Sequence, residues 1–591
     1  MDANGKNMTG DDRRNERIRI WAAWLLLSLP LFVHPLFWIR MFRARLIYWD
    51  RVTLVTLPVL AAAAAAVLLL TGWGDLRRKC RCSRLNMLLV TFAAALMALS
   101  LARTIYSGGR WNPADWYLPL MPLAGMALSR EIMRILPRWG TLVLGVLIVF
   151  TLRFPFYIGL PGNWNWNLSL LTVLLPAPFV LWHPKPRQFW QPALLATLLL
   201  TVFSLVKPDL SPRGVIVGVI VASAALWLFW QLPRRQRIFI TILGGAAGMA
   251  MFLSIWLGPA DPAIRSSRFW LWRGSVELAL RRGVFGTGAG KFEREINPYL
   301  PRAYYFSKYA TNLHTHPHNE LLAAWCEFGV LGVGFLLLLT LRAVSGLRNY
   351  SAVRVWGFWL FMVLFLHGQV DVLLQTPLAG TLCLVVGGAL AGTHTKRNAV
   401  LHPKLGMAGA AATLTLAGVT FCSSWCYREA LLNHGAGDDY LARQKVEKSL
   451  ALWDTPAARY MAGRIELLLR DPEAAIRHFE RLAPGYVHSN LYMGIAYADM
   501  GEACLDRGDK VKALRWFKEA LRCLDMEGRQ YPMSALNADV ELTILKRLGE
   551  DEELLHSRKD TLRYLLERRG ISLEELRANH ALDDIPLRRN P

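Results

Sequence analysis

The stretch "GVIVGVIVASAALWLFW", residues 214–230, contains no charged side chain. A helix needs roughly 20 apolar residues to cross the hydrocarbon core of a bilayer, and this stretch nearly fills that length. The stretch "LVTLPVLAAAAAAVLLL", residues 54–70, has the same character. Hydrophobic residues make up 53% of the 591-residue chain, and many of them are gathered in such runs. We therefore expect a polytopic membrane protein.

The apolar runs predict an all-α fold, a membrane helix bundle of about 12–13 spans. Residues 1–18 are polar, and no small-residue cleavage site follows the first apolar run. We therefore expect this run to be a retained helix rather than a removed signal peptide. The expected spans lie near 20–39, 52–72, 85–102, 115–128, 139–160, 168–182, 189–206, 214–232, 238–258, 320–341, 354–370, 378–394 and 405–424.

The distribution of Lys and Arg between the loops predicts the orientation of the spans. Cytoplasmic loops of membrane proteins carry an excess of these residues. With a cytoplasmic N-terminus, basic loops such as 74–84, 130–138 and 233–237 fall inside, whereas the arginine-rich first outer loop opposes this assignment. The expected parts are a cytoplasmic tail at 1–18, a membrane domain at 19–426 with a large outer loop at 259–319, and an outer domain at 427–591.

The net charge of +24 is unevenly distributed along the chain. From Tyr427 onward, 26 Lys and Arg stand against 28 Asp and Glu, so the positive surplus belongs to the preceding membrane part. A nucleic-acid-binding protein can be equally basic, but basic loops between membrane helices explain this pattern more simply. We expect no nucleic-acid partner.

The eight cysteines show no zinc-binding spacing. Cys80 and Cys82 are separated by one residue, which is too close for a zinc finger. Cys504 and Cys523 could form a disulfide if the C-terminal domain lies in an oxidising compartment.

The C-terminal domain contains a helical repeat of tetratricopeptide (TPR) character. Residues 463–479 realign with residues 501–517, and small residues and an aromatic residue recur at the same offsets. Small residues let two helices approach closely and the aromatic ring fills the remaining space. The repeat predicts either a docking surface for a protein partner outside the membrane or a structural cap on the membrane domain. The recurring pairs are Gly463 and Gly501, Ala475 and Ala513, and Phe479 and Phe517.

The stretch "HTHPHNELL", residues 314–322, carries three alternating histidines. Three histidines and a water are a known catalytic zinc set. Pro317 interrupts the segment, however, and no carboxylate follows at the helical spacing of a metalloprotease. A histidine-rich structural loop and a single catalytic base remain the alternatives, and we expect no metal.

Local signals place His318 at the start of a membrane helix. Asn319 precedes a long apolar run, and Asn is a good N-cap because its side chain accepts from free N–H groups of the first turn. Glu327 lies inside that helix, where a carboxylate is costly unless it is paired or faces a cavity. At the end of a later span, His367, Asp371 and Gln375 would share one face if the helix continues.

The outer loop adds basic and glycine-rich elements. Residues 266–282 resemble an amphipathic surface helix with interfacial tryptophans and arginines. "GTGAGKF", residues 286–292, lacks the first Gly and the Ser/Thr of a P-loop. It could be a nest of N–H groups for pyrophosphate or a turn without a ligand. Arg213 sits at the outer mouth of a span, as a functional charge or a snorkelling anchor.

Together these elements resemble the O-antigen ligase and O-antigen polymerase superfamily of bacterial membrane glycosyltransferases, over about residues 20–425. The most specific part runs from residue 265 to 334, and "SPRG" at 211–214 resembles another element of the family. Residues that match the family's histidine motif are His318, Asn319, Leu322, Glu327, Gly329 and Gly332.

The resemblance implies transfer of a glycan from an undecaprenyl-diphosphate carrier to an acceptor hydroxyl at the periplasmic face of the inner membrane, without cofactor or metal. Ligation to lipid A–core is the favoured reaction; glycan polymerisation and transfer to protein are alternatives. Two non-enzymatic alternatives are a scaffold that uses its TPR tail and, ranked last, a transporter. The implied catalytic residues are His318, Arg213 and Arg268. The implied substrate-binding residues are Arg265, His316, Asn319, Gly288, Gly290 and Lys291.

Overall fold

A computed structural model of the protein describes most of the chain and is helical wherever it shows regular structure. No strand occurs in the described ranges, which confirms the expected all-α fold. The described residues are 10–41, 56–71, 83–107, 113–153, 164–182, 213–231, 267–289, 291–300, 316–345, 351–371, 373–374, 376–392, 403–482, 488–532, 534–578 and a few isolated positions.

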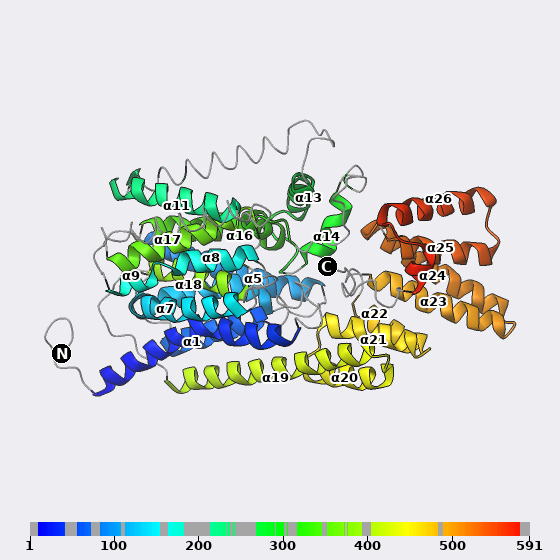
Figure 1. Ribbon diagram of the computed structural model, residues 1–591, viewed down its shortest axis with the longest axis horizontal. Coiled ribbons are helices and arrows are strands. Elements are labelled where there is room, and N and C mark those ends of the chain that lie inside the picture. The colour runs from blue at the N-terminus through cyan, green and yellow to red at the C-terminus, as the bar shows by residue number, and fades with distance from the viewer. Residues whose placement is uncertain are drawn as a thin grey trace.

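The bundle and its loop elements form the larger part of the molecule (Figure 1). Its helices are α1 (Gly10–Met41), α3 (Leu57–Thr71), α5 (Arg84–Ser107), α6 (Tyr117–Ala127), α7 (Ser129–Arg153), α8 (Trp164–Leu174), α9 (Ala177–Trp182), α11 (Arg213–Gln231), α16 (Glu320–Ser345), α17 (Ala352–His367), α18 (Pro377–Ala391) and α19 (Pro403–Gly435). The connecting elements are η3 (Pro113–Trp116), α13 (Ser267–Arg282), α14 (Phe292–Ile296) and η6 (Asn297–Tyr299).

Three described helices are long and apolar enough to cross a membrane: 84–103, 129–149 and 320–345. Shorter apolar helices include α3, α6, α11, α17 and α18. Exposed apolar side chains such as Ile105 and Val149 cover the outside of the long helices, as expected of surfaces that face lipid. The total of about 12–13 spans stays a prediction, and the predicted span at 189–206 lies outside the described residues.

The segment 130–138, predicted to be a cytoplasmic loop, is instead the first part of α7. Two of its charged side chains have partners on α1: Arg19 Nε donates to Glu131 at 2.7 Å, and Arg134 donates to Glu16 at 2.7 Å. The pair with Arg19 satisfies the buried Glu131, and Arg134 pairs at the surface, so a segment predicted to be a polar loop can continue the helix.

The centre of the bundle is packed by α17 and α18 against α6 and α7. Trp139, Trp356 and Trp359 are fully buried there. A side chain on Gly388 would place Cβ 2.0 Å from the carbonyl oxygen of Pro122, so only glycine allows α18 to lie so close to α6. Helix α16 and the turn after α17 both pack against α18. The close approach of α18 to α6 therefore fixes their position.

Helix α19 is unbroken over 33 residues, so the domain boundary predicted at 426–427 falls inside one helix. It contacts α3 on the bundle side and α20 on the other side. Figure 1 shows α19 running along the lower edge of the bundle and on to the C-terminal helices. The two parts are therefore joined by a helix and not by a loop.

The C-terminal helices pack in sequence as neighbouring pairs. A Cβ on Gly463 would lie 2.6 Å from the ring of Phe479, and one on Gly501 would lie 2.7 Å from Phe517. The predicted close packing of glycine on an aromatic ring is thus present, while the assignment to the TPR class remains a prediction. These helices are α20 (Asp439–Leu452), α21 (Pro456–Leu468), α22 (Pro472–Glu480), α23 (Ser489–Asp506), α24 (Lys510–Gln530), α25 (Ala535–Leu548), α26 (Glu552–Arg569) and α27 (Leu573–Ala578).

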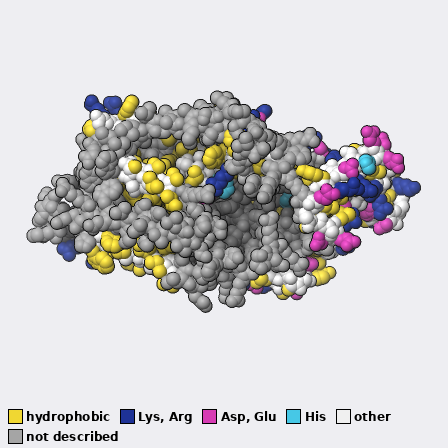
Figure 2. Space-filling model, turned by 45° about the horizontal axis from the view of Figure 1, so that its top comes forward, with side chains coloured by type: hydrophobic (Ala, Val, Ile, Leu, Met, Phe, Trp, Pro, Cys, Tyr) yellow, Lys and Arg dark blue, Asp and Glu magenta, His cyan; other side chains and the backbone are white. Residues whose placement is uncertain are grey.

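The surface of the C-terminal helices carries side chains of both charges, whereas described hydrophobic side chains lie over the bundle (Figure 2). Cys504 and Cys523 are both free and buried. Burial raises the pKa of the Cys523 thiol to about 11.

Candidate active site

The entry to α16 is shaped by Asn319. Its Oδ1 accepts from the N–H of Leu322 at 2.8 Å, and this hydrogen bond confirms the predicted N-cap. Its Nδ2 donates to the carbonyl oxygen of Gln369 at 3.1 Å. Asn319 therefore starts the helix and also fastens it to the turn that follows α17.

His318 precedes this cap in the left-handed backbone region, with φ of 54°. Its N–H donates to Nδ1 of His316 at 2.8 Å. The side chain of His318 is 39% exposed, whereas that of His316 is 2% exposed. The two histidines are therefore not equivalent: one imidazole reaches the surface and the other is enclosed.

The imidazole of His318 faces a carboxylate from the turn after α17. Its Nδ1 lies 3.5 Å from Oδ1 of Asp371, and the other oxygen of Asp371 lies 3.6 Å from Nε2 of His367. Nδ1 of His367 in turn lies 2.6 Å from the hydroxyl oxygen of buried Ser169. The separations at Asp371 are long for hydrogen bonds, and such contacts commonly tighten when substrate binds.

The helical face predicted for His367, Asp371 and Gln375 is only partly correct. Helix α17 ends at His367 and a turn follows, in which the carbonyl oxygen of Gly368 accepts from the N–H of Glu320 at 2.9 Å. His367 and Asp371 meet across this turn, and Gln375 lies outside the described residues. The pairing of Asp371 with His318 was not predicted from the sequence.

Arg268 contacts the same turn. This exposed residue of α13 donates from Nη1 to the carbonyl oxygen of Val370 at 2.9 Å. Trp272, one turn further along α13, donates to the carbonyl oxygen of Pro317 at 2.8 Å. The structure thus brings Arg268 and His318 together at residues 368–371. Figure 2 shows basic and histidine side chains near one another in the middle of one face of the bundle.

Arg213 is the first residue of α11, and its side chain lies outside what the structure describes. Helix α11 runs antiparallel to α17. Trp359 donates to Ser223 at 3.0 Å, and a Cβ on Gly218 would lie 3.5 Å from the backbone nitrogen of His367. Five residues of helix rise about 7.5 Å, so α11 begins level with the turn after His367. Arg265 and Gly290 lie outside the described residues.

The glycine-rich turn at 283–291 docks on a kink in α16. Gly329 interrupts that helix with φ of 68° and ψ of −162°. The freed carbonyl oxygens of Cys326 and Glu327 accept from the N–H groups of Thr287 and Gly288, each at 2.8 Å. Because backbone atoms of Val284 would clash with any Cβ on Gly329, at 1.9 Å, the contact requires glycine.

The N–H of Ala289 donates to Oδ1 of Asp115 at 2.7 Å. Three successive N–H groups of the turn, at residues 287–289, are therefore engaged by the protein, which favours the ligand-free alternative over a pyrophosphate nest. Contact of Gly288 or Lys291 with substrate stays a prediction.

A charged pair fastens this turn to the bundle and was not predicted. Arg103 donates to the carbonyl oxygens of Phe285 and Glu327, and its Nη1 lies 3.8 Å from Asp115. Asp115 also accepts from the hydroxyl of Ser100 at 2.8 Å. Arg103 and Asp115 each lie near the end of a helix. The sequence around them shows only basic or polar residues, so no local signal predicts that they pair.

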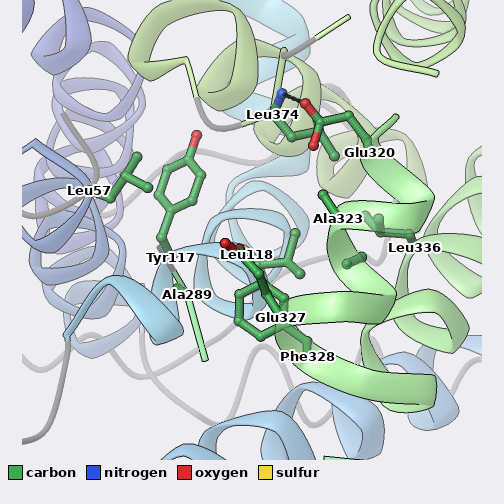
Figure 3. A pocket seen from close by; sticks show the side chains of 11 residues that line it. Leu57, Tyr117, Leu118, Ala289, Glu320, Ala323, Glu327, Phe328, Leu336 and Leu374 are labelled. Atoms are coloured by element: carbon green, nitrogen blue, oxygen red, sulfur yellow. Dashed lines mark hydrogen bonds between the residues drawn. The ribbon is translucent and has the colours of Figure 1, made fainter. Parts of the chain in front are cut away.

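A small cavity lies behind the site, between α16, α6 and α3 (Figure 3). Tyr117, Glu320 and Glu327 line it. Glu327 therefore faces a cavity, as expected for a carboxylate inside a membrane helix. Glu320 accepts from the N–H groups of Leu373 and Leu374 at 2.5 and 2.7 Å, the second of which is drawn in Figure 3.

Within the described ranges, no group of three or more His, Cys, Asp or Glu side chains is arranged to hold a metal ion. His314, the third histidine of the zinc alternative, lies outside them.

In a comparison with known families, residues 196–339 match the O-antigen ligase family. The matched segment includes α11, α13, the glycine-rich turn and His318. No curated protein and no solved structure matches the chain. The match supports the O-antigen ligase superfamily and, with the apolar helices, indicates a bacterial membrane protein.

Proposed function

We propose that the protein transfers a glycan from an undecaprenyl-diphosphate carrier to an acceptor hydroxyl at the periplasmic face of the inner membrane. The observation that carries this proposal is the meeting of His318, Asp371 and Arg268 at one turn. It joins an exposed imidazole, a carboxylate partner and an exposed guanidinium, and the match to the O-antigen ligase family supplies the substrate class.

His318 is the base in this reaction. With Nδ1 directed at Asp371, the neutral imidazole carries its proton there and presents an unprotonated Nε2. Nε2 takes the proton of the acceptor hydroxyl as the oxygen attacks the anomeric carbon of the donor sugar. Asp371 stabilises the resulting imidazolium, and the proton then passes to solvent.

The arginines act on the leaving group. As the bond between the anomeric carbon and the phosphate oxygen breaks, the diphosphate takes the electron pair and gathers negative charge. Arg268 lies at the turn, and Arg213 begins α11 at the same level. Guanidinium groups bind phosphate in a bidentate manner and stabilise such charge. Neither role requires a metal or a cofactor.

The family match to a ligase favours lipid A–core as acceptor. A growing glycan or a protein hydroxyl would use the same chemistry. The alternative in which the protein is a scaffold rests on the C-terminal TPR-like helices, which we place in the periplasm, where they would bind a protein partner.

The test is complementation of a strain that lacks the gene. Wild type is expected to restore surface glycan, whereas His318→Ala is expected to accumulate carrier-linked glycan. His556→Ala changes an exposed histidine of the C-terminal helices and is the matched control. Normal surface glycan with well-expressed His318→Ala would refute the catalytic role of His318. Mass spectrometry of the glycan-bearing product identifies the acceptor.

A further inference from the structure

His318 holds a backbone conformation that few residues other than glycine adopt. Such a conformation is retained only where the surroundings stabilise it. The hydrogen bond from the His318 N–H to Nδ1 of His316, at 2.8 Å, is the contact that supports it. The side chain of His316 therefore determines the direction in which His318 leaves the chain.

The same hydrogen bond defines the protonation of His316. Since Nδ1 accepts, the proton of the neutral ring is on Nε2. Nε2 lies 3.5 Å from Oε2 of Glu320, and both side chains are almost completely buried. Enclosed in this way, His316 offers no nitrogen to a substrate at the surface.

Glu320 extends the connection to the second half of the site. Its Oε1 accepts from the N–H groups of Leu373 and Leu374, and its own N–H donates to Gly368. These contacts lie on either side of Asp371. One residue thus holds both ends of the segment that carries the carboxylate partner of His318.

We propose that His316 and Glu320 form a positioning unit that sets His318 against Asp371, and that neither contacts the substrate. His316 orients the backbone of His318. Glu320 holds the turn at 368–374 so that Asp371 lies opposite the His318 side chain. This inference rests on the proposed function of His318 and replaces the substrate-binding role expected for His316.

Two amide variants of His316 distinguish the role of its Nδ1 from that of its Nε2. In Asn the side-chain oxygen stands as many bonds from Cβ as Nδ1, so His316→Asn retains an acceptor for His318. In Gln the amide stands at the position of Nε2, so His316→Gln retains only the contact with Glu320. We expect His316→Asn to keep transfer within about threefold of wild type, and His316→Gln and His316→Ala to lower kcat at least about tenfold.

Glu320 provides a second, independent pair of variants. Glu320→Gln keeps an oxygen for the N–H groups of Leu373 and Leu374, whereas Glu320→Leu does not. Hydrogen–deuterium exchange of the purified full chain in detergent is expected to rise over residues 368–376 in Glu320→Leu and to stay near wild type in Glu320→Gln. Exchange over residues 316–322 is expected to rise in His316→Gln but not in His316→Asn.

Transfer is measured with carrier-linked glycan extracted from the deletion strain as donor and membranes of that strain as acceptor. An unchanged kcat with a raised KM in His316→Ala would show substrate contact and overturn the proposal, as would a His316→Asn protein as inactive as His316→Ala. If wild type transfers nothing, the proposed function fails, and the exchange measurements still decide whether the unit positions these segments.

Discussion

The glycine contacts of the C-terminal helices and the His318 site differ in how far apart along the chain their partners lie. Gly463 packs on Phe479 and Gly501 on Phe517 within neighbouring helices. At the site, Arg268 reaches Val370 across 102 positions and Arg103 reaches Phe285 across 182. Local contacts leave a periodic trace in the sequence, whereas the site exists only once distant segments have come together.

The largest expected effect comes from the long-range contact between His318 and Asp371. Asp371→Asn keeps the shape of the side chain but removes the charge that stabilises the His318 imidazolium. We expect transfer to fall about 10²–10³-fold, in kcat more than in KM. Kinetics with carrier-linked donor check this, with Asp560→Asn at the surface as control. A loss below about threefold would mean that the site does not depend on this contact.

Gly329→Ala tests the docking of the glycine-rich turn. The added Cβ would meet the carbonyl oxygen of Val284 at 1.9 Å, and φ of 68° disfavours alanine. We expect a loss of about 3 kcal/mol or more in stability, together with lost transfer.

Gly145 is the matched control for that variant. It lies in α7 with nothing within 4 Å of an added Cβ. Gly145→Ala is expected to stay within about 1 kcal/mol of wild type. Thermal unfolding in detergent compares the two, and equal melting temperatures would contradict the docking argument.

Gly501→Ala tests the local contact. The new Cβ would lie 2.7 Å from the ring of Phe517, so we expect a loss of about 1–3 kcal/mol. Because the damage is confined to α23 and α24, transfer is expected to persist at reduced protein yield. Gly528→Ala, whose Cβ would have its nearest neighbour at 3.4 Å, is the control. Complete loss of transfer at normal yield would instead favour the scaffold alternative.

The smallest expected effect concerns pH. Burial and neighbouring arginines lower the pKa of His478 to about 4. The unfolded chain, with a pKa near 6.5, then binds more protons than the folded chain between these values, so stability falls as pH drops through this window. For this half-buried group, screening by water reduces the contribution to about 1 kcal/mol.

His478→Gln stays neutral at every pH and is expected to remove that part of the acid sensitivity. Melting temperatures of wild type and variant at pH 7 and pH 4.5 measure it, with exposed His556→Gln as reference. An identical pH dependence in wild type and His478→Gln would show that His478 is as readily protonated in the folded chain as in the unfolded chain.

Sequence reasoning reached those features whose causes are local. The Asn319 cap was predictable because donor and acceptor lie three residues apart. For Glu327 the cost of a carboxylate in a membrane helix predicted either a charged partner or a cavity, and the structure shows a cavity. The glycine–aromatic packing followed from the repeat.

The remaining features depend on tertiary contacts. Segment 130–138 is helical because α1 supplies its ion pairs. The chain turns after His367, where Gly368 accepts from Glu320. The partnership of His318 with Asp371, and that of Arg103 with Asp115, join segments whose proximity no periodicity encodes.

The unbroken α19 has a mechanical consequence. A helix of 33 residues is about 50 Å long, and it resists bending far more than a peptide linker of equal residue count. A domain on a flexible linker samples many positions relative to the bundle. A domain on a stiff helix stays at one distance and in one orientation. Because α19 contacts α20 and α3 alike, the C-terminal helices are held at a fixed position relative to the bundle.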